Sequence, residues 1–317
     1  MKLRLWFFLL STALFLSSGS VLAQEREHCP SIKFGSVGWV DAGAGSAVAG
    51  VLLTALGYKV SIQRYTTSVI LASMKNRDID VFMEAMVPTM GNELKPFILD
   101  GSIELITENL QGTKYTLAAN KAASALGIQS FSDIAKHGEA LNNKIYSTDT
   151  GSDGSQILAR MIADKAFGLE NFELVTLSER QLVLEARKLS DKQLPVVMLA
   201  FEPHPRNVLL DLSYLAGGDD YFGDNFGGAD IYTGVRTGFV ADCPNAVVLI
   251  SRLQYELGMT NELMTYIMEL KAKPEVAAMT WLRQNANQLK LWLKDVTTID
   301  GAPALPATMS FLGLAGN

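Results

Sequence analysis

Strand-like and helix-like runs alternate from the start of this chain. They lie at residues 32–37, 44–56, 59–65, 68–75 and 79–83, in the order strand, helix, strand, helix, strand. Apolar runs of strand length between amphipathic or Ala-rich runs of helix length are typical of βαβ units. The rhythm therefore predicts an α/β fold with an open sheet of parallel strands.

A second series with the same rhythm starts near residue 114. Its runs lie at residues 114–117, 144–147, 155–167, 181–189 and 196–201, in the order strand, strand, helix, helix, strand. After Gly227-Gly228, residues 231–240 look extended again, and about seventy residues at the end are mainly helical.

Residues 1–23 have the features of a secretory signal peptide. Lys2 and Arg4 are their only charges, residues 5–16 are almost all apolar, and Ala23 is suited to cleavage. A membrane anchor is the alternative, but the apolar run is short for a bilayer span. We expect a soluble protein, exported to the periplasm, that begins at Gln24.

Both cysteines, Cys29 and Cys243, lie in the part expected to be exported, where oxidising conditions permit a disulfide. Two separate buried thiols are the alternative. A disulfide is favoured, because each cysteine precedes a proline at an element boundary and the compartment fits. It would tie the start of the mature chain to a late segment.

The 294 residues after the signal exceed the usual size of one hydrophobic core. We expect two α/β lobes: residues 24–113 and 209–317 form lobe 1, and residues 114–208 form lobe 2, inserted between them. Two crossover strands, near residues 112–116 and 204–210, would serve as hinges. Ligands of such sheets bind beyond the carboxyl ends of the strands.

The charge balance argues against nucleic acid as a partner. Without the signal, 25 Lys and Arg stand against 33 Asp and Glu, whereas phosphate backbones require clustered basic residues. The negative balance mildly favours cations.

Templates for catalysis and cofactor binding mostly fail in this sequence. The three histidines, His28, His137 and His204, do not occur at metal-ligand spacing, and there is no Gly-x-Ser-x-Gly motif. Gly43-Ala44-Gly45 has part of a dinucleotide loop, but Val48 stands where a third small residue is needed. We expect no enzyme activity, no metal and no cofactor.

Two segments offer groups that can bind a small cation. Gly38-Trp39-Val40-Asp41 places an indole and a carboxylate after the first strand, and Phe201 ends a later strand before Glu202-Pro203-His204-Pro205. A Trp face attracts a cation by about 0.5 to 2 kcal/mol, although packing alone would also explain this tryptophan. Residues 149–155 form a polar turn, in which Asp153 caps the next helix, contributes to a ligand site, or both.

These segments together resemble the substrate-binding proteins of quaternary-ammonium ABC importers, most closely their periplasmic choline-binding branch. The resemblance covers essentially the whole mature chain. It rests on the order and spacing of Gly38-Trp39-Val40-Asp41, Asp80-Val81-Phe82, Val87-Pro88-Thr89-Met90, Lys114-Tyr115-Thr116-Leu117-Ala118, Ser152-Asp153-Gly154, Glu202-Pro203-His204-Pro205 and both cysteines. It implies a two-lobed, type II-like periplasmic-binding-protein fold that closes on its ligand, and a Cys29–Cys243 disulfide.

The resemblance also implies a set of ligand contacts, namely Trp39, Asp41, Met86, Tyr115, Ser152 and Phe201. Met86 and Phe201 stand where the choline-binding branch has tryptophans, and Ser152 stands where it has an asparagine. Phe and Met attract a cation less strongly than Trp does. Glu84 either adds a second negative charge to the site or faces solvent or a helix.

The sequence therefore predicts a monomeric periplasmic solute-binding protein that delivers a small cationic amine to an ABC permease and its ATPase. Choline is the first candidate ligand, and another amine, a betaine or a guanidinium compound is the alternative. Two other classes stay open. One is an exported enzyme acting on a similar molecule, with Asp41 and His204 as the nearest candidate groups; the other is a sensor module that presents the loaded form to a membrane receptor.

Overall fold

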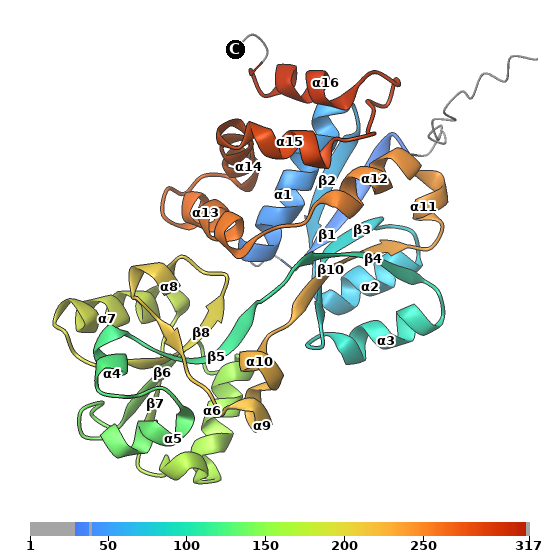
Figure 1. The fold of residues 1–317 in the computed structure, drawn as a ribbon. Helices are drawn as coiled ribbons and strands as arrows, with labels where there is room; N and C mark the ends of the chain where they lie inside the picture. Colours follow the sequence, from blue (N-terminus) through green and yellow to red (C-terminus); the bar gives the residue numbers. More distant parts are fainter. Residues whose placement is uncertain (1–28, 38–39, 315–317) are drawn as a thin grey trace, which may run out of the picture.

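The computed structural model describes residues 29–37 and 40–314, and for residues 40–42 the backbone only. The segment expected to be the signal peptide lies outside the described residues. Figure 1 shows two α/β lobes, each built on its own sheet, with chain segments that pass between them. The predicted two-lobed α/β architecture is confirmed.

Lobe 1 is built on a five-stranded sheet with the order β2-β1-β3-β10-β4. Its strands are β1 (Ser31–Ser36), β2 (Lys59–Arg64), β3 (Val81–Val87), β4 (Ile103–Leu110) and β10 (Asp230–Arg236). β1 runs parallel to β2 and β3, but β10 runs antiparallel to β3 and β4. The predicted parallel arrangement holds for β1, β2 and β3, whereas β10 inserts in the opposite direction and makes the sheet mixed.

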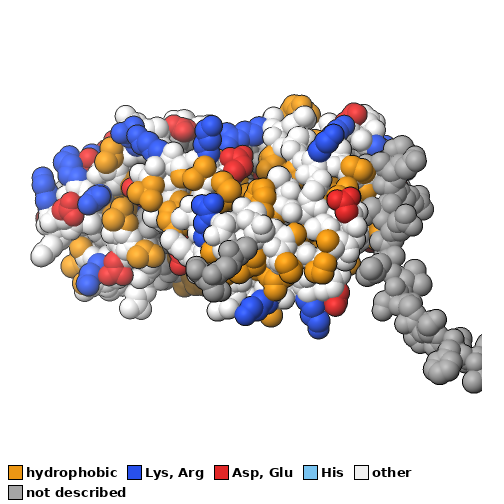
Figure 2. Space-filling view, turned by 90° about the horizontal axis from the view of Figure 1, so that it is seen from above, with side chains coloured by type: hydrophobic (Ala, Val, Ile, Leu, Met, Phe, Trp, Pro, Cys, Tyr) orange, Lys and Arg blue, Asp and Glu red, His pale blue; other side chains and the backbone are white. Residues whose placement is uncertain are grey.

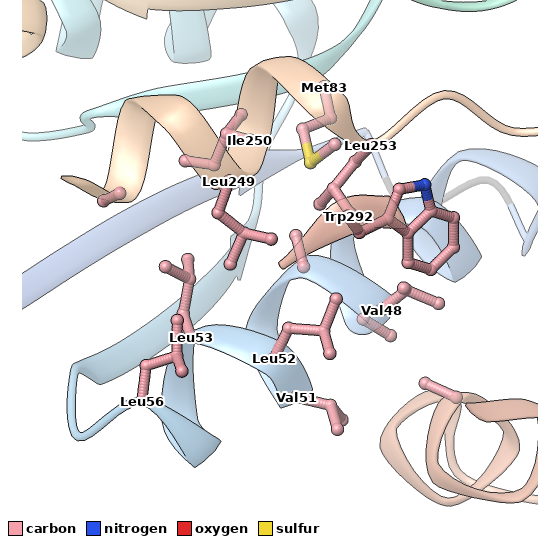
Figure 3. Close-up of a cluster of buried hydrophobic side chains, with 14 of the residues drawn as sticks. Val48, Val51, Leu52, Leu53, Leu56, Met83, Leu249, Ile250, Leu253 and Trp292 are labelled. Carbon is pink, nitrogen blue, oxygen red and sulfur yellow. The ribbon is translucent and has the colours of Figure 1, made fainter. Parts of the chain in front are cut away.

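Helices cover both faces of this sheet. They are α1 (Val40–Ala55), α2 (Thr67–Lys75), α3 (Gly91–Leu99), α11 (Phe239–Asp242), α12 (Pro244–Arg252), α13 (Leu257–Met268), α14 (Pro274–Gln284), α15 (Ala286–Trp292) and α16 (Ala304–Phe311). α1 and the C-terminal helices share one core, part of which is drawn in Figure 3, where Leu52 of α1 and Leu249 of α12 lie near Met83 of β3. Phe82 and Ala85 belong to a separate core with α2 and α3.

Lobe 2 has a second five-stranded sheet with the order β7-β6-β8-β5-β9. Its strands are β5 (Lys114–Ala119), β6 (Lys144–Ser147), β7 (Glu173–Thr176), β8 (Val197–Glu202) and β9 (Ser213–Tyr214). β6 runs parallel to β7 and β8, whereas β5 runs antiparallel to β8 and β9. This sheet is mixed as well.

Lobe 2 has two longer helices, α6 (Asp153–Ala163) and α7 (Glu179–Asp191). Its other helices have four or five residues, namely α4 (Lys121–Ala125), α5 (Phe131–Ile134), α8 (Arg206–Leu209), α9 (Asp219–Phe222) and α10 (Asp224–Gly227), with 3₁₀ turns at Ala135–His137 and Ala166–Gly168. Val197 and Leu199 of β8 pack in the core with α4 to α6, while Met198 packs in the core with α7. Burial on both faces explains the unbroken apolar run of this strand.

The chain passes between the lobes twice, and the second crossing differs from its predicted place. The first joins β4 to β5 at residues 111–113, near the expected position. The second crossing, from lobe 2 back to lobe 1, was expected at residues 204–210. The chain is still in lobe 2 beyond that point, because β9 pairs with β5 through Tyr214 and Ala118. The chain re-enters the sheet of lobe 1 only at β10. The prolines before residue 206 mark a turn within lobe 2.

The two crossings are bonded to each other. The Thr113 hydroxyl donates to the Ala229 carbonyl at 2.5 Å and accepts from the Ala229 N–H at 3.0 Å. Gly228 has to be glycine, because a Cβ there would lie 2.5 Å from the Thr113 carbonyl oxygen. The two segments that connect the lobes therefore lie side by side.

The structure contains the predicted disulfide between Cys29 and Cys243, with the Cα atoms 5.3 Å apart, within the usual range for a bridge. Cys29 lies two residues before the start of β1, and Cys243 lies between α11 and α12. The bridge ties the first strand of lobe 1 to the segment that follows its last strand.

Candidate functional site

A cavity of about 420 Å³ lies between the two lobes. Lobe 1 contributes Met86, Thr89, Ile231, Met264 and Met268, and lobe 2 contributes residues from β5, β8, the β6–α6 turn and α7. Four of the six expected contact residues line it, namely Met86, Tyr115, Ser152 and Phe201. Trp39 lies outside the described residues, and so does the side chain of Asp41, whose backbone belongs to the first turn of α1.

Two other hollows are present among the described residues. One, of about 470 Å³, is lined by parts of α2 and α3, and the other, of about 930 Å³, lies beside the α12–α13 connection. Of these three hollows, the cavity between the lobes is the one that combines strand ends of both sheets with apolar and polar side chains, which is the usual composition and place of a ligand site in α/β proteins.

Tyr115 and Phe201 lie directly opposite each other on β5 and β8. The Tyr115 hydroxyl donates to Asp153 Oδ1 at 2.6 Å and accepts from the Gly154 N–H at 3.1 Å. Burial, together with the bond to Asp153, raises the pKa of Tyr115 above its usual range. The ring is therefore neutral and fixed in orientation where it meets the cavity.

Two other side chains pack against Phe201. The His204 ring meets it edge-on with centroids 4.9 Å apart, and the Arg206 guanidinium carbon lies 4.4 Å from the Phe201 centroid. Arg206 is 1% exposed and does not line the cavity. Sequence reasoning did not predict that the ring expected to bind the ligand is already in contact with a buried cation, the Arg206 guanidinium.

Ser152 is the N-cap of α6, since its hydroxyl accepts from the Ser155 N–H at 3.3 Å. The capping role considered for Asp153 thus belongs to the preceding residue. Asp153 instead follows the cap and accepts from Tyr115 and from the Gly154 N–H. Ser152 both caps the helix and lines the cavity, so the two functions coexist at this turn.

Acidic groups outnumber basic ones in the cavity wall. Asp149, Asp153, Glu179 and Glu202 line it, against Lys114, which pairs with Glu202 across β5 and β8. An excess of carboxylates favours a positively charged ligand. On the outer face shown in Figure 2, basic, acidic and hydrophobic side chains are interspersed over both lobes.

At the edge of the cavity, the buried His204 pairs with Glu179, whose side chain is partly exposed. His204 Nε2 lies 3.0 Å from Glu179 Oε1, and Nδ1 accepts from the backbone N–H of Arg206 at 3.0 Å. Nδ1 is therefore unprotonated and Nε2 carries the proton. Burial lowers the pKa of His204, and the hydrogen bond from His204 lowers the pKa of Glu179.

Acid is expected to destabilise the protein through this pair. Both groups have lower pKa values in the folded chain than in the unfolded chain, so the unfolded chain binds more protons as the pH falls. The stability that His204 contributes to the folded state is present above pH 6.5 and is lost as the pH falls through its lowered pKa. The stability that Glu179 contributes is lost below pH 4.5, as the pH falls through the lowered pKa of that carboxyl. Urea unfolding at pH 7.5 and 5.5 should give a lower free energy of unfolding at pH 5.5. His204→Gln should reduce the difference, and an equal difference in this variant would contradict the assignment.

Among the lobe 1 residues of the cavity that sequence reasoning missed are two methionines, Met264 and Met268. They stand four residues apart on α13 and so share one face of that helix. The spacing was visible in the sequence, but methionines at helical spacing are more often core residues, and nothing local places α13 against the cavity.

Within residues 29–37 and 40–314, no group of three or more His, Cys, Asp or Glu side chains is arranged to hold a metal ion. Over the same part of the chain, no helix has the length and apolar character required to cross a membrane.

Comparison with solved structures identifies close relatives of this fold. An ABC-transporter choline binding protein in complex with choline is 41% identical, with a TM-score of 0.75, and the match covers 91% of this chain and 100% of that one. An ABC-transporter choline binding protein in an unliganded semi-closed conformation is also 41% identical, with a TM-score of 0.72 and coverage of 90% and 99%.

Sequence comparison gives the same family. The glycine betaine/carnitine transport binding protein GbuC of Listeria monocytogenes serotype 1/2a is 25% identical over 208 residues, which are 66% of this chain and 64% of that protein. The model of the substrate binding domain of ABC-type glycine betaine transport systems (OpuAC) matches residues 30–284. Because this family binds substrates for transporters, the alternative of an exported enzyme is set aside. The chain belongs to the family of substrate-binding domains of ABC-type glycine betaine transport systems.

Proposed function

We propose that this protein is the periplasmic solute-binding component of an ABC importer and that it binds choline or a related quaternary ammonium compound between its lobes. In this proposal residues 1–23 direct export and are removed, and a monomer delivers the ligand to the permease and its ATPase. The alternative ligand is another amine, a betaine or a guanidinium compound.

The observation that carries the proposal is the cavity itself. It brings Met86, Tyr115, Ser152 and Phe201 together from both lobes, with carboxylates in excess over basic groups. Aromatic faces attract a quaternary ammonium group through their quadrupoles. The choline complex of a 41% identical protein supports choline as the first ligand to test.

Each contact residue has a proposed role. Tyr115 and Phe201 enclose the ammonium group together with Trp39, and Met86 packs against its methyl groups. Asp41 and Ser152 bind the polar end of the ligand, since a carboxylate and a hydroxyl can both accept a hydrogen bond from an alcohol.

The lobe division is also part of the proposal. We propose that closure bends the crossings at residues 111–113 and 228–229, because these segments connect the two sheets and are bonded to each other. Lobe 2 would then extend beyond the residue 208 boundary expected from sequence, up to α10.

Thermal unfolding tests the ligand class. A ligand that binds only the folded protein adds about 2.7 kcal/mol of stability at a concentration 100 times its Kd, which corresponds to a rise in Tm of roughly 5 to 10 °C. Choline should raise the Tm of the mature protein in this manner, whereas ethanolamine, which lacks the methyl groups, should do so less. Equal shifts with both compounds would favour a general amine site over a quaternary ammonium site.

A further inference from the structure

The two sides of the cavity between the lobes differ in chemistry. Lobe 2 supplies the rings of Tyr115 and Phe201 and all the charged side chains that line the cavity in the described part of the chain. From the same part of the chain, lobe 1 supplies Thr89, Ile231 and three methionines. Lobe 1 therefore presents a mainly apolar surface to a ligand that lobe 2 holds.

The three methionines form most of this surface, and we call them the methionine wall. Met86 lies on β3, and Met264 and Met268 lie on α13, the helix of lobe 1 that faces lobe 2 in Figure 1. Residues four apart in a helix share one face, so both side chains of α13 reach the same cavity. Met86 and Met268 are half-buried, and Met264 is 1% exposed.

The methionine wall and the aromatic rings of lobe 2 differ in how well they adapt to a ligand. A methionine side chain is unbranched and has three rotatable bonds and a polarizable sulfur, so it packs against apolar groups of different shape. The Tyr115 ring, by contrast, is fixed by its hydrogen bonds to Asp153 and to the Gly154 N–H. Differences in the size of a ligand are therefore accommodated on the side of lobe 1.

We propose that Met264 and Met268, together with Met86, contact the alkyl groups of the ligand and allow the site to take quaternary ammonium compounds with N-alkyl groups larger than methyl. This inference rests on the proposed function. The rings and carboxylates of lobe 2 bind the positive charge, which methyl and ethyl compounds share. The methionine wall rearranges around the larger groups, and burial of their additional methylene groups strengthens binding.

Triethylcholine is the matched probe for this inference. It has the charge and the hydroxyl group of choline and differs only in carrying three N-ethyl groups in place of three N-methyl groups. Calorimetric titration of the whole mature protein should give a Kd for triethylcholine within about tenfold of the Kd for choline. A weaker affinity than this would overturn the inference.

The double variant Met264→Ile with Met268→Ile tests the adaptability of the wall. Isoleucine is apolar and similar in size, but its β-branched side chain is stiff in a helix. Choline should bind this variant with nearly native affinity, and triethylcholine should bind about tenfold more weakly than it binds the native protein. Met279→Ile is the matched control, because Met279 is a half-buried methionine of α14 that does not line the cavity. The control should keep both Kd values, and a native ratio of the two Kd values in the double variant would contradict the role of the wall.

Oxidation of the native protein tests the same contact without a substitution. Hydrogen peroxide converts accessible methionines to sulfoxides, and mass spectrometry of the peptides gives the rate at each one. Saturating choline or triethylcholine should slow the oxidation of Met86 and Met268. Met279 and Met309, which are half-buried and do not line the cavity, should react at the same rate with and without ligand. Unchanged rates at Met86 and Met268 in the loaded protein would show that the wall does not cover the ligand.

The native protein separates this inference from the proposed function. Tight binding of choline with rejection of triethylcholine would overturn the inference and leave the proposed function in place. Binding of neither compound would contradict the proposed function itself, and the inference would fall with it.

Discussion

Replacement of Phe201 by alanine is expected to weaken binding of a quaternary ammonium ligand by about tenfold or more. The lost cation–π attraction amounts to about 0.5 to 2 kcal/mol, and each 1.4 kcal/mol changes the Kd about tenfold. Removal of the ring also deprives the methyl groups of an apolar contact. Calorimetric titration of the variant and the native protein with choline measures the effect directly.

Phe201→Trp provides the control in the opposite direction, because an indole attracts a cation more strongly than a benzene ring does. It should bind choline at least as tightly as the native protein. Phe131→Leu tests for a general effect of lobe 2 stability, since Phe131 is buried in that lobe but does not line the cavity. It should lower the Tm and keep the native Kd. Native affinity in Phe201→Ala would show that this ring does not contact the ligand.

Loss of the Cys29–Cys243 disulfide is expected to cause the largest change in stability. The bridge spans 214 residues, and closing a loop of this length in the unfolded chain accounts for about 5 kcal/mol in the chain-entropy description. Reduction with dithiothreitol should therefore lower the Tm by roughly 10 °C or more.

The double variant Cys29→Ser with Cys243→Ser should start from that lower Tm and should not respond to dithiothreitol. A thiol assay on the denatured, unreduced protein checks the bridge itself. Two reactive thiols in that assay would contradict the disulfide, and an equal Tm with and without reductant would contradict its contribution to stability.

The sequence predicted the elements well where a local pattern determines them. The runs at residues 32–37, 59–65 and 144–147 became β1, β2 and β6, because each is a short apolar or alternating run bounded by turn residues. β4 was missed: its residues, Ile-Glu-Leu-Ile-Thr-Glu-Asn-Leu, mix charged and apolar side chains, and several of them are half-buried.

Strand direction and the second crossing could not be predicted in this way. The side-chain pattern of β10 does not predict that this strand inserts between β3 and β4 in the opposite direction. The neighbouring strands and the direction of a strand depend on the path of the whole chain. Two residues, Ser213 and Tyr214, form β9 and keep the segment after Pro205 in lobe 2. A strand of two residues is too short to show the alternation of apolar and polar side chains from which strands are predicted.

The residues of the candidate site also fall into two groups: those that a local pattern predicts and those that depend on the packing of distant segments. Met86, Tyr115, Ser152 and Phe201 were found because they follow or end strands and match a family pattern, and the structure brings all four to one cavity. Met264 and the partners of Phe201 were not found. α13 is more than 170 residues from Met86 in the chain, and the packing of Arg206 on Phe201 depends on the turn made by residues 203–205.

Calorimetric titration of the mature protein, refolded to remove any ligand carried through purification, tests the central claim most directly. The ligands are choline, glycine betaine, carnitine, a primary amine and a guanidinium compound. The account predicts saturable one-to-one binding of a methylated ammonium compound, and weakening of that binding in Phe201→Ala. Absence of binding by every methylated compound, with binding of the primary amine or the guanidinium compound, would contradict the quaternary ammonium site while keeping the transport fold.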